Sequence, residues 1–164
     1  AVTGVQTCAL PIFQVVQTVK TDTFSTSSTT PVDITGMSAT ITPTSTTSKI
    51  LIIVDLKWSV YAYGDIYLLR GSTKLYYGDL YGNQTQSSLH AYGNGSYGSD
   101  YDMAYGHITY LDSPASTSAQ TYKLQAATPY SSGYTLAVNY GRPNDNVNYM
   151  SRLASSITLM EIAQ

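Results

Sequence analysis

Residues 49–61 carry the strongest pattern in the chain, a strict alternation of apolar and polar side chains. One face of this segment consists of Ile50, Ile52, Val54, Leu56, Trp58 and Val60. The other face is dominated by Lys49, Asp55, Lys57, Ser59 and Tyr61. Because successive side chains of a strand point to opposite faces of a sheet, this period of two predicts a half-buried antiparallel β-strand. Leu51 and Ile53 add apolar side chains to the second face, so we expect that end to be covered from both sides.

Short strands separated by turns are expected along the rest of the chain. Residues 66–70 and 73–77 predict a hairpin around Gly71, and residues 105–111 and 120–127 predict a second strand pair. The other expected strands lie at residues 13–19 (an edge strand), within the Ser/Thr-rich 21–30 and the following 32–37, and at 134–140 and 156–162. Many short strands and no helical period predict an all-β fold, an antiparallel β-sandwich of the jelly-roll type.

The last expected strand is apolar on both faces. Ile157 and Leu159 fall on one face, whereas Met160 and Ile162 fall on the other. A strand of this kind must be covered twice, either within the sandwich or against another subunit.

The composition excludes several classes of function. Only 11% of the residues are charged and the formal net charge is −2, without a basic cluster, so we expect no nucleic-acid partner. No apolar run reaches the length of a membrane-spanning helix, so we expect no membrane insertion. A surface whose solubility depends on hydroxyl and amide groups suits an extracellular or virion location.

Residues 1–12 are interpreted as non-native. Residues 2–12 match, residue for residue, the translation of a common short-read sequencing adaptor, and they resemble no folding motif. A broken apolar core and the lack of a charged leading region argue against a signal peptide. We therefore assign residues 13–164 to one domain. The only cysteine, Cys8, lies in the excluded segment and supports no disulfide or redox argument.

Several motifs resemble a domain found at the C-terminal ends of marine and environmental phage tail-fibre and virion structural proteins. They are residues 14–25, 33–37, 41–43, 48–51, 69–73 and 111–114, and the closing Ser156-Ile157-Thr158-Leu159-Met160-Glu161-Ile162. The resemblance covers residues 13–164, although residues 61–105 follow no pattern of that family. The family resembles tumour-necrosis-factor-like jelly rolls, which implies a homotrimer about a three-fold axis and a place on the virion.

Tyrosine is concentrated in residues 61–110, where it repeatedly precedes glycine. Tyrosine offers a large, rigid, amphipathic surface, and neighbouring Gly, Ser and Asn add adaptable hydrogen bonding. We expect a ligand-binding surface for a host glycan or protein at Tyr76, Tyr77, Tyr81, Tyr92, Tyr97 and Tyr101. The other interpretation is that the tyrosines pack inside the sandwich or a trimer interface, and it is favoured at Tyr61, Tyr67, Tyr105 and Tyr110.

Catalytic and cofactor sites are not expected. Residues 93–98 match G-x-G-x-x-G, but no helix or βαβ unit surrounds them, so a loop is the better interpretation. With one Glu and two widely spaced His residues, the chain lacks the groups for a catalytic or metal site. Asp100, Asp102 and residues 144–146 are interpreted as turns rather than as calcium ligands. A histidine on a three-fold axis stays open as a metal ligand.

The resemblance and the tyrosines together predict a non-enzymatic receptor-binding domain at the distal end of a phage tail fibre. Two alternatives stay open: a structural trimerisation or decoration domain of a virion, and a secreted bacterial lectin-like adhesin. Exposure separates recognition from the structural role. Recognition requires exposed side chains at Tyr81, Tyr92, Tyr97 and Tyr101, whereas the structural role would place them in the three-fold interface.

Overall fold

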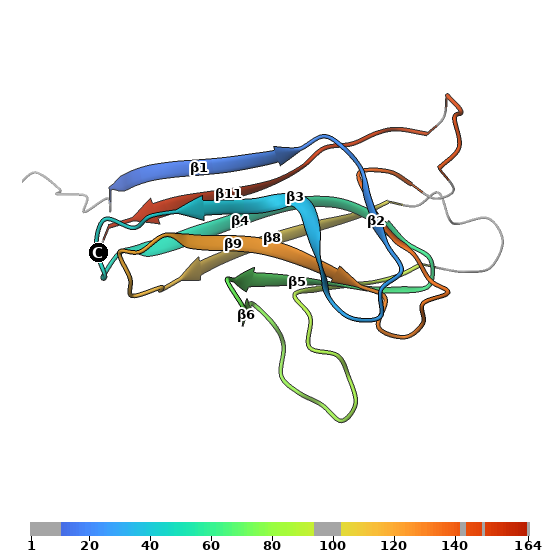
Figure 1. Ribbon diagram of the computed structural model, residues 1–164, viewed down its shortest axis with the longest axis horizontal. Helices are drawn as coiled ribbons and strands as arrows, with labels where there is room; N and C mark the ends of the chain where they lie inside the picture. The colour runs from blue at the N-terminus through green and yellow to red at the C-terminus, as the bar shows by residue number, and fades with distance from the viewer. Residues whose placement is uncertain (1–10, 94–102, 142–143, 149, 164) are drawn as a thin grey trace, which may run out of the picture.

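Two antiparallel β-sheets pack face to face in the computed structural model, which describes residues 11–93, 103–141, 144–148 and 150–163 (Figure 1). The first sheet contains β1 (Ile12–Lys20), β11 (Ser155–Ile162), β4 (Lys49–Val60), β8 (Ala104–Asp112), β10 (Leu136–Val138) and β2 (Phe24–Thr26). The second contains β3 (Val32–Ile41), β9 (Gln120–Ala127), β5 (Tyr63–Arg70), β6 (Thr73–Leu75) and β7 (Leu89–Tyr92). The described residues form no helix. The predicted jelly-roll β-sandwich is confirmed.

Strand β4 is the centre of the first sheet. One edge of β4 pairs with β11 and then with β10, and the other edge pairs with β8. The inward side chains from Ile50 to Trp58 are at most 2% exposed, which confirms the alternation. They meet Ile66 and Leu68 of β5 and Leu124 of β9 in one hydrophobic core. Burying a side chain of this size contributes about 1.5–3 kcal/mol.

The expected strands largely form. Strand β1 lies at one edge of the first sheet, as predicted, and begins one residue early at Ile12. The Ser/Thr-rich segment contributes β2, and its Phe24 packs against the core. The β5–β6 hairpin also forms, although β6 ends at Leu75 rather than at the expected residue 77. Its turn residue Gly71 has a φ of 57°, a conformation that glycine adopts without steric cost.

The predicted pairing of residues 105–111 with 120–127 is wrong. Strand β8 pairs with β4 in the first sheet, whereas β9 pairs with β3 and β5 in the second. Each strand has one apolar face, and these faces meet across the core, where Ile108 and Leu124 are fully buried. The connection crosses between sheets, and the Tyr122 hydroxyl donates a hydrogen bond across the crossing to Asp112 Oδ2 (2.7 Å).

An apolar row crosses four strands on the outward face of the first sheet. The register places Val15, Met160, Leu51 and Leu111 side by side on β1, β11, β4 and β8. Val15 and Leu111 are 55% and 46% exposed. Met160 and Ile162 on the outward face of β11 stay partly exposed, so cover of these two side chains within the sandwich is wrong. Cover by another subunit stays a prediction.

Asn139 ties four segments together after β10. Its backbone N–H donates to Lys57 O, and its side-chain Nδ2 donates to Lys20 O and Asp22 O at 2.9 Å each. Its Oδ1 accepts from Ser155 Oγ at 2.6 Å. Asn139 is fully buried and has a φ of 67°, a left-handed conformation that asparagine tolerates better than most residues. It joins β1, β4 and β11 at the end of the first sheet.

Glu161, the only glutamate of the chain, anchors the opposite end of the same sheet. Gln14 Nε2 donates to Oε2 at 2.6 Å, and both N and Oγ1 of Thr44 donate to Oε1 at 2.7 Å. Burial opposes ionisation of this carboxyl, but the hydrogen bonds outweigh burial and lower its pKa to about 2. The ionised side chain therefore joins β1 and the β3–β4 connection to β11.

Candidate functional site

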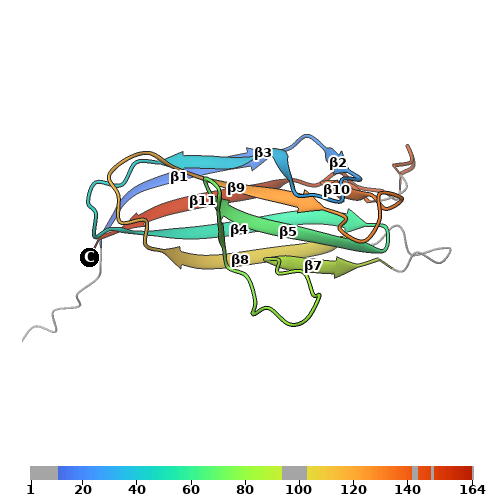
Figure 2. The same ribbon diagram turned by 60° about the horizontal axis from the view of Figure 1, so that its bottom comes forward.

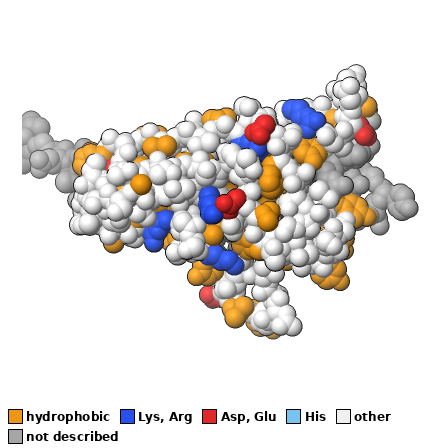
Figure 3. Space-filling model, in the orientation of Figure 1, with side chains coloured by type: hydrophobic (Ala, Val, Ile, Leu, Met, Phe, Trp, Pro, Cys, Tyr) orange, Lys and Arg blue, Asp and Glu red, His pale blue; other side chains and the backbone are white. Residues whose placement is uncertain are grey.

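Three of the predicted ligand-binding tyrosines lie in one projecting loop, residues 76–88. Strands β6 and β7 pair end to end with the same edge of β5, and the loop leaves the sheet at the break between them (Figure 2). Its large side chains are exposed: Tyr76 by 46%, Tyr77 by 52%, Leu80 by 71% and Tyr81 by 77%. Figure 3 shows hydrophobic side chains on this projection below the body of the protein. The loop presents amphipathic surface to solvent.

The base of the projecting loop is fixed to the sheet. Ser88 Oγ accepts from Leu68 N (2.9 Å) and donates to Leu75 O (3.1 Å), and Ser88 N donates to Ile66 O (2.8 Å). Within the loop, the Gln86 side chain donates to Gly78 O at 2.8 Å. These bonds hold the two ends of the loop side by side. The exposed tyrosines are therefore presented from a fixed base.

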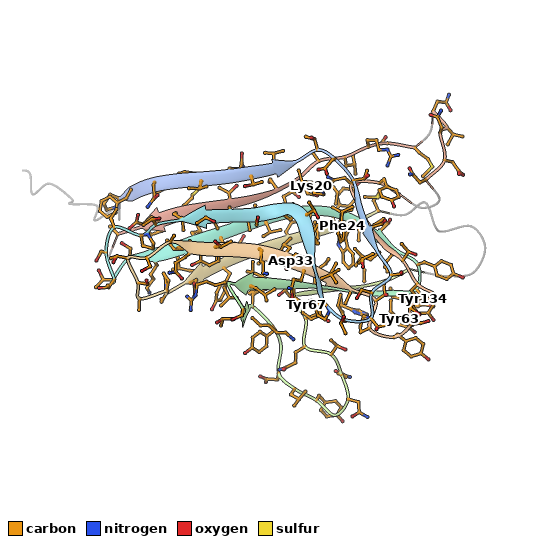
Figure 4. All side chains as sticks on the ribbon, viewed as in Figure 1. Lys20, Phe24, Asp33, Tyr63, Tyr67 and Tyr134 are labelled. Atoms are coloured by element: carbon orange, nitrogen blue, oxygen red, sulfur yellow. The ribbon has the colours of Figure 1, made fainter. Side chains whose placement is uncertain are left out.

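Tyr92 lies outside this loop, in a second group of aromatic side chains. We call Tyr61, Tyr63, Tyr92, Tyr130 and Tyr134 the tyrosine cluster. Tyr63 is central because its ring centroid lies 4.9 Å from that of Tyr92, 5.4 Å from Tyr130 and 6.2 Å from Tyr134. Tyr130 stacks on Tyr134 at 5.9 Å, and Tyr61 meets Tyr134 edge-on at 5.8 Å. Figure 4 places Tyr63 and Tyr134 together at one end of the sandwich.

Strand pairing assembles the tyrosine cluster. Tyr63 and Tyr92 are direct partners on β5 and β7. Gly93, the next residue, donates to Ala62 O at 2.5 Å, and a Cβ at this position would lie 1.9 Å from Val60 O. Only glycine allows the chain to approach so closely here. Tyr92 and Tyr130 remain 61% and 75% exposed, so the cluster presents aromatic surface to solvent.

The phenol of Tyr134 remains a neutral hydrogen-bond donor. Loss of hydration raises the pKa of Tyr134, and the neighbouring Tyr130 and Tyr63 raise it further. A neutral phenol can both donate and accept a hydrogen bond at physiological pH.

Two hollows flank the projecting loop. The first, of about 650 Å³, is lined by residues that include Tyr76, Tyr77 and Tyr110, and the rings of Tyr76 and Tyr110 lie 5.9 Å apart. The second, of about 590 Å³, lies against Tyr63 and Tyr130 of the tyrosine cluster. Both volumes fall within the range of ordinary small-molecule sites, about 300–1,000 Å³.

A buried carboxylate forms part of the second hollow. Asp65 is only 2% exposed, and its Oδ1 lies 2.7 Å from Nδ1 of His90. Its Oδ2 lies 3.4 Å from the Tyr67 hydroxyl. Burial raises the pKa of Tyr67, and the Asp65 carboxylate raises it further, so this phenol stays protonated and can donate. The hollow thus combines aromatic and acidic groups.

Some of the exposed tyrosines were predicted from the sequence. Tyr76, Tyr77, Tyr81 and Tyr92 are exposed, whereas Tyr97 and Tyr101 lie outside the described residues. The site residues that the sequence did not single out are Tyr63, Asp65, His90, Tyr130 and Tyr134. These residues come from segments that are far apart in the chain, and strand pairing brings the segments together.

The four tyrosines expected to be structural differ from one another. Tyr67 is 3% exposed, Tyr61 and Tyr110 are half-buried, and Tyr105 is 63% exposed. Packing inside the sandwich is therefore confirmed for Tyr67 and wrong for Tyr105, whereas packing of Tyr105 against another subunit stays a prediction. Tyr105 lies on the outward face of β8, where its hydroxyl group can remain in water.

No group of three or more metal-ligating side chains occurs among the described residues. His90 and His107 face different aspartates, Asp65 and Asp55, at 2.7 Å and 3.4 Å. In the 144–152 region, Arg152 Nη2 donates to Asn144 Oδ1 at 2.5 Å and so occupies one oxygen that a cation would need.

No protein-family model and no curated protein matches the chain. Within the described residues, no helix is long and apolar enough to span a lipid bilayer.

Proposed function

We propose that this chain is a non-enzymatic recognition domain of a phage tail fibre, which binds a glycan or protein on the host cell surface. The observation that supports this proposal is the projecting loop, whose base is hydrogen-bonded to β5 while Tyr77, Leu80 and Tyr81 remain more than half exposed. Exposed aromatic side chains on a fixed base lose little conformational entropy when they bind. The adjacent tyrosine cluster extends this surface.

We expect the double variant Tyr77→Ala/Tyr81→Ala to weaken binding to host cells about tenfold or more, because aromatic anchors carry most of the energy of many interfaces. Binding is measured with labelled protein on a panel of bacterial isolates and on a glycan array. Tyr105→Ala is the matched control, since Tyr105 is also exposed but lies on β8 of the other sheet. If the unmodified domain binds no cell or glycan, or if the double variant binds equally well, the proposal is wrong.

A structural role in a homotrimer is the second candidate. It is favoured by the apolar row on the outward face of the first sheet, which contains Val15, Leu51, Leu111 and Met160. An exposed row of this kind is typical of a surface that packs against another protein. We propose that a second and a third copy of the chain cover it. Recognition and trimerisation use different faces and are compatible.

We expect the unmodified chain to have three times its monomer mass in solution and Leu51→Glu to be a monomer. A carboxylate in the middle of the apolar row would have to be buried without a partner in the interface. Size-exclusion chromatography with light scattering measures the mass. Thr40→Glu is the control, because Thr40 is exposed on β3 of the other sheet. A monomeric unmodified chain would remove the trimer proposal and leave recognition standing.

A further inference from the structure

We propose that the second hollow, between the tyrosine cluster and residues 83–87, binds one uncharged pyranose ring of a glycan. The inference rests on the proposed function and specifies its ligand. Three kinds of side chain meet in this hollow: the exposed rings of Tyr63 and Tyr130, the buried carboxylate of Asp65 with His90, and a wall of amide and hydroxyl groups.

The aromatic wall suits the C–H face of a sugar. Tyr130 is 75% exposed and Tyr63 is 37% exposed, and both rings line the hollow. Their faces are electron-rich and apolar, which favours packing against the weakly positive C–H bonds of a pyranose. A cage for a quaternary ammonium ion is excluded for these rings. Such a cage needs its guest between the rings, and Tyr63 lies only 4.9 Å from Tyr92 and 5.4 Å from Tyr130.

The acidic floor suits sugar hydroxyl groups. Asp65 Oδ1 faces His90 Nδ1 at 2.7 Å, but Oδ2 has only the 3.4 Å contact with the Tyr67 hydroxyl. A carboxylate has room for about four hydrogen bonds, so Oδ2 can accept one from a ligand. In the neutral tautomer that donates from Nδ1, the Nε2 of His90 is an acceptor, and the side chain is 55% exposed. Both groups can accept O–H donors.

The third wall is polar without charge. Asn83, Gln84, Thr85 and Ser87 line the hollow and offer both donors and acceptors. The described lining residues include no Lys or Arg. A sialic acid or a phosphorylated sugar would therefore bring its negative charge toward Asp65 without a Lys or Arg side chain to compensate it. Neutral hexoses and N-acetylhexosamines avoid this repulsion, and we expect the hollow to select them.

The test is a nuclear magnetic resonance titration of the unmodified chain with single sugars. The probes are methyl β-galactopyranoside, methyl α-glucopyranoside, methyl N-acetyl-β-glucosaminide and, as the acidic comparison, N-acetylneuraminic acid. We expect saturable binding of at least one neutral sugar, with shifts at residues 83–90 and 130, and none of the acidic sugar. Loss of one stacking ring weakens such binding about threefold to tenfold, so Tyr130→Ala should do so, while Tyr130→Phe retains it.

A second variant tests the floor. Asp65→Asn keeps the shape of the side chain but removes its charge, and we expect sugar binding about tenfold weaker. Tyr105→Ala on the other sheet is the control and should bind like the unmodified chain. The inference is overturned if no neutral sugar binds, if the acidic sugar binds best, or if Tyr130→Ala leaves binding unchanged. Cell binding that survives Tyr130→Ala but not Tyr77→Ala/Tyr81→Ala would refute the sugar site and support the proposed function.

Discussion

Replacing Asn139 by alanine is expected to lower the free energy of unfolding by about 3 kcal/mol or more. The variant removes the side-chain bonds to Lys20 O, Asp22 O and Ser155 Oγ and leaves these groups without that partner in a buried site. Each lost bond of this kind costs roughly 1 kcal/mol or more. Alanine must also adopt the φ of 67°, which adds about 1–2 kcal/mol. Urea denaturation at one fixed protein concentration measures the effect.

Two further variants separate the causes of this loss. Asn139→Gly also lacks the hydrogen bonds but adopts a positive φ freely, so it should be about 1 kcal/mol more stable than Asn139→Ala. Asn83→Ala is the control, because Asn83 is exposed in the projecting loop and should change stability by less than about 0.5 kcal/mol. If Asn139→Ala were as stable as Asn83→Ala, the junction of Lys20, Asp22 and Ser155 would not depend on this side chain.

Acid is expected to destabilise the fold through Glu161. Its pKa falls from 4.5 to about 2 on folding, so the folded state binds protons less readily than the unfolded state. The stabilisation by this carboxylate is therefore complete above pH 4.5 and is lost as the pH falls through about 2. Glu161→Gln should remove this part of the pH dependence. At neutral pH it should cost about 2 kcal/mol, because charge-assisted bonds from Gln14 and Thr44 are lost.

Thermal unfolding at a series of pH values measures this difference. Asp33→Asn is the control, since hydrogen bonds from Lys123 and Gln125 lower the pKa of Asp33 but the group lies on the surface. An exposed ion pair of this kind contributes little to stability. We expect Asp33→Asn to follow the acid profile of the unmodified chain closely. Equal profiles for Glu161→Gln and the unmodified chain would show that other groups govern acid unfolding.

The fold class was predictable because it depends on local alternation. The period of two in β4 is a direct consequence of one buried face, and Gly71 marks the β5–β6 turn. The partners of β8 and β9 were not predictable in this way. Both strands have one apolar face. Such strands can lie side by side in one sheet or face each other across the core, and the alternation of side chains is the same in both cases.

The candidate site, like the fold, was predictable only in part. Tyr81 of the projecting loop was predictable because it lies in a polar stretch without alternation, which is expected to be exposed. The tyrosine cluster was not, since Tyr63, Tyr92 and Tyr130 come together only through the pairing of β5 with β7 and the turn after β9. The role of Asp65 in the site could not be predicted from the sequence either. Its burial beside His90 depends on the same strand pairing.

The break between β6 and β7 has a consequence for how such a domain can diversify. The last residue of β6, Leu75, faces Leu68 of β5, and the first residue of β7, Leu89, faces Ile66, so the loop starts and ends at nearly the same point of one strand. The distance between the two ends of the loop does not increase when residues are inserted. Doubling the length of a flexible loop raises the free energy of loop closure by only about 0.6 kcal/mol. Insertions or grafted peptides at residues 79–85 should therefore leave the sandwich intact, so new binding specificities can arise on an unchanged scaffold.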